Sequence, residues 1–240
     1  MYVNDSTAIE EMKRECHACC TEDPGSDMIL ESVLANDPIL WLGNSTKLFS
    51  LASIKLIVLS ILQHLPYYQK NSEQLVRGLK IGRELDYECI TSQLVIYTCY
   101  GNGNARHIAE ELRNKGNGNI QTRDAGELSR NDILQEICPN PQCEVLLLYL
   151  NKDVFKDPDG EVSELVELSL KKGMVPVLVF EQDAGEGKCD FSLLYSQTPD
   201  ELLAHGLFGE LAIPMYNIPD YRKVSLHLLM QKMSDICSTL

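Results

Sequence analysis

Gln93–Cys99 (QLVIYTC) begins the stretch that decides the fold of this chain, and two further apolar runs, Cys143–Tyr149 (CEVLLLY) and Met174–Phe180 (MVPVLVF), follow it. Helical patterns separate the three runs, so we expect the corresponding strands to be parallel and buried on both faces. Parallel strands joined by crossover helices leave few topologies open. The sequence therefore predicts an α/β fold with an open, doubly wound sheet of five parallel strands.

Weaker patterns complete the predicted sheet. Ile120–Arg123 is expected to be a short second strand, and Leu211–Met215 an edge strand, because Pro214 suits an edge. The helices expected around the sheet are Ala105–Lys115, Ser129–Ile137, Glu161–Lys172, Pro199–Ala204 and Tyr221–Ile236. Sites in such sheets lie beyond the carboxyl ends of the strands. The segments expected at that edge are Tyr100–Asn104, Asp124–Leu128, Leu150–Gly160 and Glu181–Lys188.

The first 90 residues contain helical patterns and turns but no strand pattern. Ser45–Leu65 is expected to form a long helix with a broad apolar face, and Pro66 is expected to stop it. The phrases Ala35–Pro38 and Asn71–Val76 resemble parts of a helical repeat of the armadillo type. We therefore divide the chain into a helical N-terminal domain, residues 1–90, and an α/β domain, residues 91–240.

The composition excludes several classes of function. The 240 residues have a formal net charge of -14, which disfavours binding to nucleic acid and to anionic membranes. No apolar run approaches the ~20 residues of a membrane span, and the polar, acidic N-terminus argues against a signal peptide. We therefore expect a cytoplasmic protein without a membrane span.

The nine cysteines are an odd number without the spacing of a disulfide scaffold, and free thiols in a reducing cytosol are the simplest interpretation. Cys16 and Cys19 have the spacing of a zinc knuckle, and Cys138 with Cys143 could supply further ligands. Cysteines on a helix are more often small apolar fillers. We therefore expect no metal.

The glycine-rich turn Tyr100–Asn104 (YGNGN) leads directly into a predicted helix. Free N–H groups at a helix N-terminus can bind phosphate, and the turn also resembles the phosphate loop of flavodoxins. The candidate nucleotide- or cofactor-binding residues are Tyr100, Gly101, Asn102, Asn104 and Arg106. The alternative is a strand-to-helix turn that needs glycine for a positive φ.

A second resemblance covers roughly residues 92–238. Arg123-Asp124 at a strand end, the turn Ala125-Gly126, the third strand with Asn151–Phe155 after it, and Met174–Phe180 with its Val-Pro-Val core resemble Toll/interleukin-1 receptor (TIR) domains. Membership in this family implies a flavodoxin-like sheet and a role in intracellular signalling, including innate immunity. It also implies homotypic association with other TIR-type domains, in a homo-oligomer and without a cofactor.

The resemblance assigns two functional segments. The loop with Asp124, Gly126 and Glu127 would serve association, together with the helix Glu161–Lys172; the alternative is an exposed loop capped by Asp124 and made flexible by Gly126. Some TIR domains hydrolyse NAD with a helix glutamate, and Glu164 occupies that place, with NAD as substrate. Glutamates at i, i+3 spacing can also simply be solvated. A flavodoxin-like nucleotide-binding module is the third hypothesis.

Overall fold

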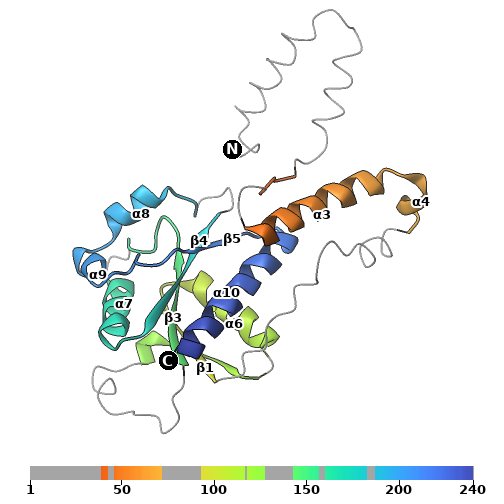
Figure 1. Cartoon of the computed structure of the whole chain (residues 1–240). Coiled ribbons are helices and arrows are strands. Elements are labelled where there is room, and N and C mark those ends of the chain that lie inside the picture. The colour runs from red at the N-terminus through yellow and green to blue at the C-terminus, as the bar shows by residue number, and fades with distance from the viewer. Residues whose placement is uncertain are drawn as a thin grey trace, which may run out of the picture. The chain divides into compact units, whose positions relative to one another are not determined.

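The computed structural model describes residues 39–42, 46–71, 93–116, 118–127, 143–156, 160–182 and 187–239 (Figure 1). The chain divides into two compact units, Met1–Glu84 and Leu85–Leu240. The cysteine cluster at 16–20, the two repeat-like phrases for the most part, and the predicted helix Ser129–Ile137 lie outside the described residues.

In the first unit the predicted long helix is confirmed. Helix α3 spans Lys47–Gln63, and the hydroxyl of its N-cap, Thr46, accepts the Phe49 N–H. The short helix α4, Pro66–Gln69, begins at the proline that was expected to stop α3. Proline is favoured at a first helical position because its missing N–H would have no partner there.

The second unit contains the predicted sheet, which has five parallel strands in the order β2-β1-β3-β4-β5. This is the flavodoxin-like arrangement. The strands are β1 (Leu94–Thr98), β2 (Ile120–Asp124), β3 (Cys143–Leu150), β4 (Val175–Glu181) and β5 (Ile213–Met215). All of β1 and nearly all of β3 are buried, which explains their continuous apolar sequence. Pro214 lies in the edge strand β5, as expected.

Helices cover both faces of the sheet and create two cores (Figure 1). The helices α6 (Gly103–Lys115) and α10 (Pro219–Thr239) pack on one face. The other face is covered by η1 (Ala125–Glu127), α7 (Glu161–Lys171), α8 (Phe191–Gln197) and α9 (Asp200–Ala204). Side chains of β1 alternate between the two cores, so Ile96 faces α6 and Tyr97 faces α7.

The element boundaries follow the sequence patterns with small differences. Helix α6 begins two residues before the predicted start, and α8 was not predicted. Gly173 has φ 82° just after Lys172, the C-cap of α7, which is a position that favours glycine. Helix α8 escaped prediction because its Phe191-Ser-Leu-Leu-Tyr195 core is too short to establish a helical period.

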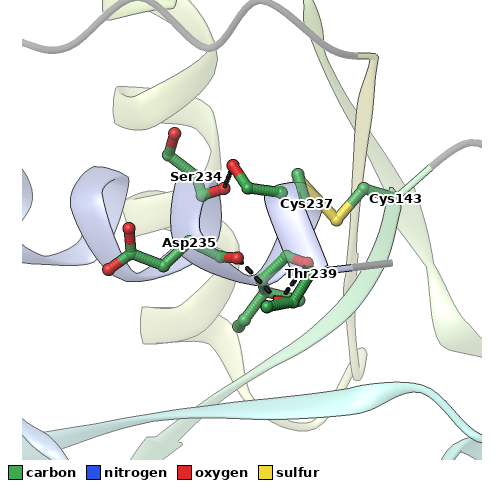
Figure 2. Close-up of a disulfide and its surroundings, with 7 residues drawn as sticks. Cys143, Ser234, Asp235, Cys237 and Thr239 are labelled. Atoms are coloured by element: carbon green, nitrogen blue, oxygen red, sulfur yellow. Dashed lines mark hydrogen bonds between the residues drawn. A yellow bond between two sulfur atoms is a disulfide. The ribbon is translucent and has the colours of Figure 1, made fainter.

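The expectation of free thiols is wrong for two cysteines, because Cys143 and Cys237 form a disulfide (Figure 2). The bond joins the first residue of β3 to the last turn of α10, across 94 residues of sequence. In the same turn the Thr239 hydroxyl donates to the Asp235 carbonyl at 2.8 Å. The disulfide also removes Cys143 as a metal ligand, and the described residues contain no group of three potential ligands.

Candidate functional site

The turn after β1 and the end of β3 are joined at the carboxyl edge of the sheet by one side chain. Asn102 Nδ2 donates to the Tyr149 carbonyl at 2.9 Å, and the Tyr149 N–H donates to Asn102 Oδ1 at 3.0 Å. Asn102 is buried. Its side-chain amide pairs with the N–H and the carbonyl of Tyr149 as the backbone of a neighbouring strand would. The predicted ligand-binding residue Asn102 thus holds the turn in place through both ends of its amide.

A small cavity of about 190 Å³ lies at this junction of the β1 and β3 loops. Its lining consists of Gly101, Asn102, Gly103, Asn104, Asn151, Asp153 and Val154. Three of the five predicted cofactor-binding residues are among them. Tyr100 is 73% exposed and outside the lining, and Arg106 pairs with Glu110 at 3.4 Å on the surface of α6. The cavity lies at the switch point of the strand order, where such sheets bind ligands.

The glycine of this turn is required for a different reason from the one expected. Neither Gly101 nor Gly103 has a positive φ. A Cβ at position 101 would lie 2.7 Å from Val162 Cγ2, whereas a Cβ at position 103 would meet nothing within 4 Å. The first turn of α7 therefore packs so closely on the turn after β1 that residue 101 has no room for a side chain.

Glu164, the predicted catalytic residue, is exposed and does not line the small cavity or the larger one on the α6–α10 side of the sheet. The buried residues of α7 are Val162, Val166 and Ser169. Glu161 is also exposed, and Glu167 pairs with Lys171, which lowers the pKa of the Glu167 carboxyl. A catalytic role for Glu164 in NAD hydrolysis stays a prediction.

The predicted interaction loop begins with a capped turn. The Gly126 N–H donates to Asp124 Oδ1 at 2.8 Å, and Ala125 is fully buried beneath the turn. Glu127 is the last residue of η1, and Leu128 lies outside the described residues. Burial, with Asp124 and Glu161 nearby, raises the pKa of the Cys99 thiol to about 12. The ends of β1 and β2 and the start of α7 are therefore close neighbours.

A larger cavity of about 330 Å³ lies on the α6–α10 side of the same edge. Its lining consists of Asn104, His107, Ile108, Tyr149, Glu181, Asn217 and Arg222. The Tyr149 hydroxyl donates to Glu181 Oε2. Sequence reasoning named Glu181 and Asn104 as parts of the carboxyl edge but missed the other five, because no local motif marks any of them.

The two lateral sides of the sheet differ in charge. At the outer strand β2, Arg113 and Lys115 of α6 lie on one face of the sheet and Arg123 lies on the other, beside Tyr97; we call these three residues, next to Asp124, the basic edge. Arg113 Nη1 donates to Thr122 Oγ1 at 3.4 Å. Among its described residues, the connection between β4 and the other outer strand, β5, has four acidic side chains, and two basic side chains lie nearby. The acidic residues are Asp190, Asp200, Glu201 and Glu210, and the basic neighbours are Lys188 and Lys232, of which Lys232 pairs with Glu210 at 2.8 Å.

An aromatic cluster lies among these acidic residues. The Phe191 and Phe208 rings are 5.1 Å apart between centroids, and the Tyr195 and Phe208 rings 6.1 Å. Phe191 is 46% exposed and Tyr195 52% exposed. Leu194 is buried on the opposite side of α8, so the helix presents both of its aromatic rings to the surface.

These features define the class of the protein: a flavodoxin-like α/β unit with two polar cavities at the carboxyl edge of its sheet. Comparison of the chain with protein-family models, with curated proteins and with solved structures found no match. None of the helices in the described part of the chain has both the length and the apolarity that a bilayer span requires.

Proposed function

We propose that the α/β unit is a signalling module that associates head to tail with further copies of itself, as the resemblance to TIR domains implies. The observation that supports this proposal is the opposite charge of its two sides. The basic edge at β2 and the acidic, aromatic surface of α8 and α9 belong to opposite sides of one sheet. Complementary charge guides association and fixes its register.

Because the basic and acidic surfaces lie on opposite sides of the unit, they determine which kind of contact between copies is favourable. A two-fold contact brings the same patch of both copies together. If the acidic surface of α8 and α9 made such a contact, acidic residues would face acidic residues in a chain of net charge -14. A head-to-tail contact brings Arg113 and Arg123 of one copy to Asp200 and Glu201 of the next. Such a heterologous contact repeats from copy to copy and generates a ring if the rotation closes or an open filament if it does not.

The aromatic cluster supplies the apolar part of the contact. Exposed aromatic residues surrounded by polar ones are typical of interaction sites. Phe191 and Tyr195 are ordered by contact with Phe208, so little side-chain freedom is lost when a partner covers them. The predicted interaction loop, with Asp124, Gly126 and Glu127, begins at the last residue of β2 and would lie beside the basic edge in the contact.

A mixing experiment tests the proposal on the full chain. One variant reverses the basic edge (Arg113→Glu with Arg123→Glu), and a second reverses the acidic surface (Asp200→Lys with Glu201→Lys). We expect the unmodified chain to form concentration-dependent oligomers in light scattering. Each variant alone should stay monomeric, whereas an equimolar mixture should form oligomers again, because the retained sides of the two variants pair and their two reversed sides are again opposite in charge.

Two further variants sharpen this test. Tyr195→Ser removes an exposed ring and should weaken association about tenfold, while Lys223→Glu, an exposed change on α10, serves as a matched charge control with no effect. Association should also weaken as salt rises, because exposed charges are screened. A chain that stays monomeric at every concentration and salt, or variants that oligomerise like the unmodified chain, would contradict the proposal.

The small cavity supports a second candidate function, the binding of a nucleotide. It lies at the β1/β3 switch point and is lined by the glycine turn at the start of α6. Incubation with NAD tests the enzymatic form: release of nicotinamide that Glu164→Ala abolishes would identify an NAD hydrolase. Binding of NAD without turnover would identify a nucleotide-binding module, and a yellow purified protein a flavin-binding one.

A further inference from the structure

The larger cavity at the carboxyl edge brings together polar side chains from five parts of the α/β unit. They come from α6, the ends of β3 and β4, the loop after β5 and the first turns of α10. Neither the association proposal nor the predicted site residues account for this convergence, apart from Asn104. A cavity of about 330 Å³ falls in the size range of small-molecule sites.

The carboxylate of this cavity is held in one position by a chain of hydrogen bonds. Asn102 fixes the backbone of Tyr149 through two bonds, and the Tyr149 hydroxyl then donates to Glu181 Oε2. Tyr149 is 4% exposed, so its ring cannot turn away. A carboxylate offers about four lone-pair positions, so Glu181 can accept further hydrogen bonds from a ligand.

The guanidinium of the cavity is neutralised by a neighbour. Arg222 Nε and Nη2 both lie 2.9 Å from Glu111 Oε2, and Arg222 Nη1 donates to Asn217 Oδ1 at 3.3 Å. An anion entering the cavity would meet Glu181 and an arginine whose charge is already compensated. A phosphate group is therefore a poor ligand for this cavity.

The remaining lining favours a ligand that both donates and accepts hydrogen bonds. The Asn104 and Asn217 amides can do both, the His107 ring can do either, and Glu181 accepts. Hydroxyl groups match this mixture, and a carboxylate at the end of a strand is a known kind of partner for the vicinal hydroxyls of a ribose. We propose that this cavity binds a sugar through its vicinal hydroxyl groups, with Glu181 as their acceptor.

Asn104 lines both cavities, so a phosphate attached to the sugar would extend toward the smaller one. Saturation-transfer NMR on the full chain therefore uses ribose 5-phosphate, 2-deoxyribose 5-phosphate, free ribose and inorganic phosphate. We expect ribose 5-phosphate to bind at least tenfold more tightly than its 2-deoxy analogue. Tighter binding than free ribose identifies a phosphorylated sugar as the ligand, and equal binding identifies a free sugar; both outcomes support the proposal.

Glu181→Gln should weaken the binding of ribose 5-phosphate about tenfold or more, since hydrogen bonds to charged groups are the stronger ones. Glu144→Gln is the matched control, because Glu144 also accepts from a tyrosine hydroxyl, that of Tyr97, but at the other end of the sheet. Asn217→Ala, a change in an exposed loop, gives a second test should the Glu181 variant unfold. Equal binding of the 2-deoxy analogue, binding of inorganic phosphate alone, or unchanged affinity in both cavity variants would overturn the proposal.

Discussion

A tyrosine–glutamate pair occurs at each end of the sheet, and the two pairs have different surroundings. Near the amino end, Tyr97 donates to Glu144 at 3.4 Å, and Lys172 lies 3.8 Å from Glu144 and 5.9 Å from the centre of the Tyr97 ring. At the carboxyl end, Tyr149 donates to Glu181 and the pair faces a cavity. A tyrosine–glutamate pair is therefore structural where a lysine closes over it and available to a ligand where the helices leave room.

Covalent closure strengthens this contrast, because the Cys143–Cys237 disulfide also lies at the amino end. Burial and the nearby Glu144 raise the pKa of the Tyr97 hydroxyl, which keeps this hydroxyl neutral and able to donate. The amino end thus acts as the rigid base of the unit. The loops that line both cavities belong to the carboxyl end, as is usual for open parallel sheets.

The largest expected effect comes from removing the disulfide at the amino end of the sheet. Cys237→Ser should lower the free energy of unfolding by about 2–4 kcal/mol, because a disulfide that closes a long loop restricts the unfolded chain. Urea denaturation with and without a reducing agent measures this change, and Cys189→Ser at a free cysteine is the control. Binding of ribose 5-phosphate at the opposite end should not change. An unfolding midpoint that does not respond to the reducing agent would contradict a disulfide at the amino end.

The second effect concerns the turn after β1, at the carboxyl end of the sheet. Gly101→Ala should lower the free energy of unfolding by about 1–3 kcal/mol, because the new Cβ would overlap Val162. Val162 is buried and β-branched, so it cannot rotate aside. Gly103→Ala, where the space is open, is the matched control and should be neutral or slightly stabilising. Equal stability of the two variants would show that α7 does not pack on this turn.

The smallest effect is a pH dependence of stability that comes from the Cys99 thiol, at the carboxyl end of the sheet. The Cys99 thiol has a pKa of about 12 in the folded chain, against 9.0 for an ordinary thiol, because it is buried and lies near Asp124 and Glu161. The folded state holds this proton longer than the unfolded state does. Its contribution to stability is therefore complete below about pH 9 and is lost as the pH rises toward 12, by at most about 1.4 kcal/mol per pH unit.

Denaturation of the unmodified chain and of Cys99→Ala at pH 8, 9 and 10 measures this contribution, and the difference between the two curves removes the effect of other alkaline groups. The unmodified chain should lose more stability between pH 9 and 10 than the variant loses. Cys189→Ser, at a half-buried thiol, is the matched control. Identical slopes in all three proteins would show that Cys99 reaches solvent at the end of β1.

The strands were predictable because their burial on both faces leaves a continuous apolar run, as in Leu94–Thr98 and Cys143–Leu150. The expected gathering of loops at one edge was also correct, since Gly101–Asn104 and Asn151 line one cavity. Gly101 was identified for the wrong reason: the sequence suggested a positive φ, whereas the cause is the approach of Val162 from a helix about 60 residues later. His107, Asn217 and Arg222 were missed because nothing in their own segments marks them.

The sequence by itself determined the parallel α/β sheet, the approximate positions of its strands and the edge at which its loops gather, because strand burial and helix ends are recorded locally in residue patterns. Only the tertiary structure decided which side chains meet. The disulfide, the Asn102–Tyr149 link and the two cavities depend on segments far apart in sequence that the strand order brings together. The physical reason is that a contact depends on position in three dimensions, whereas a local pattern specifies only which side of its own helix or strand a residue occupies.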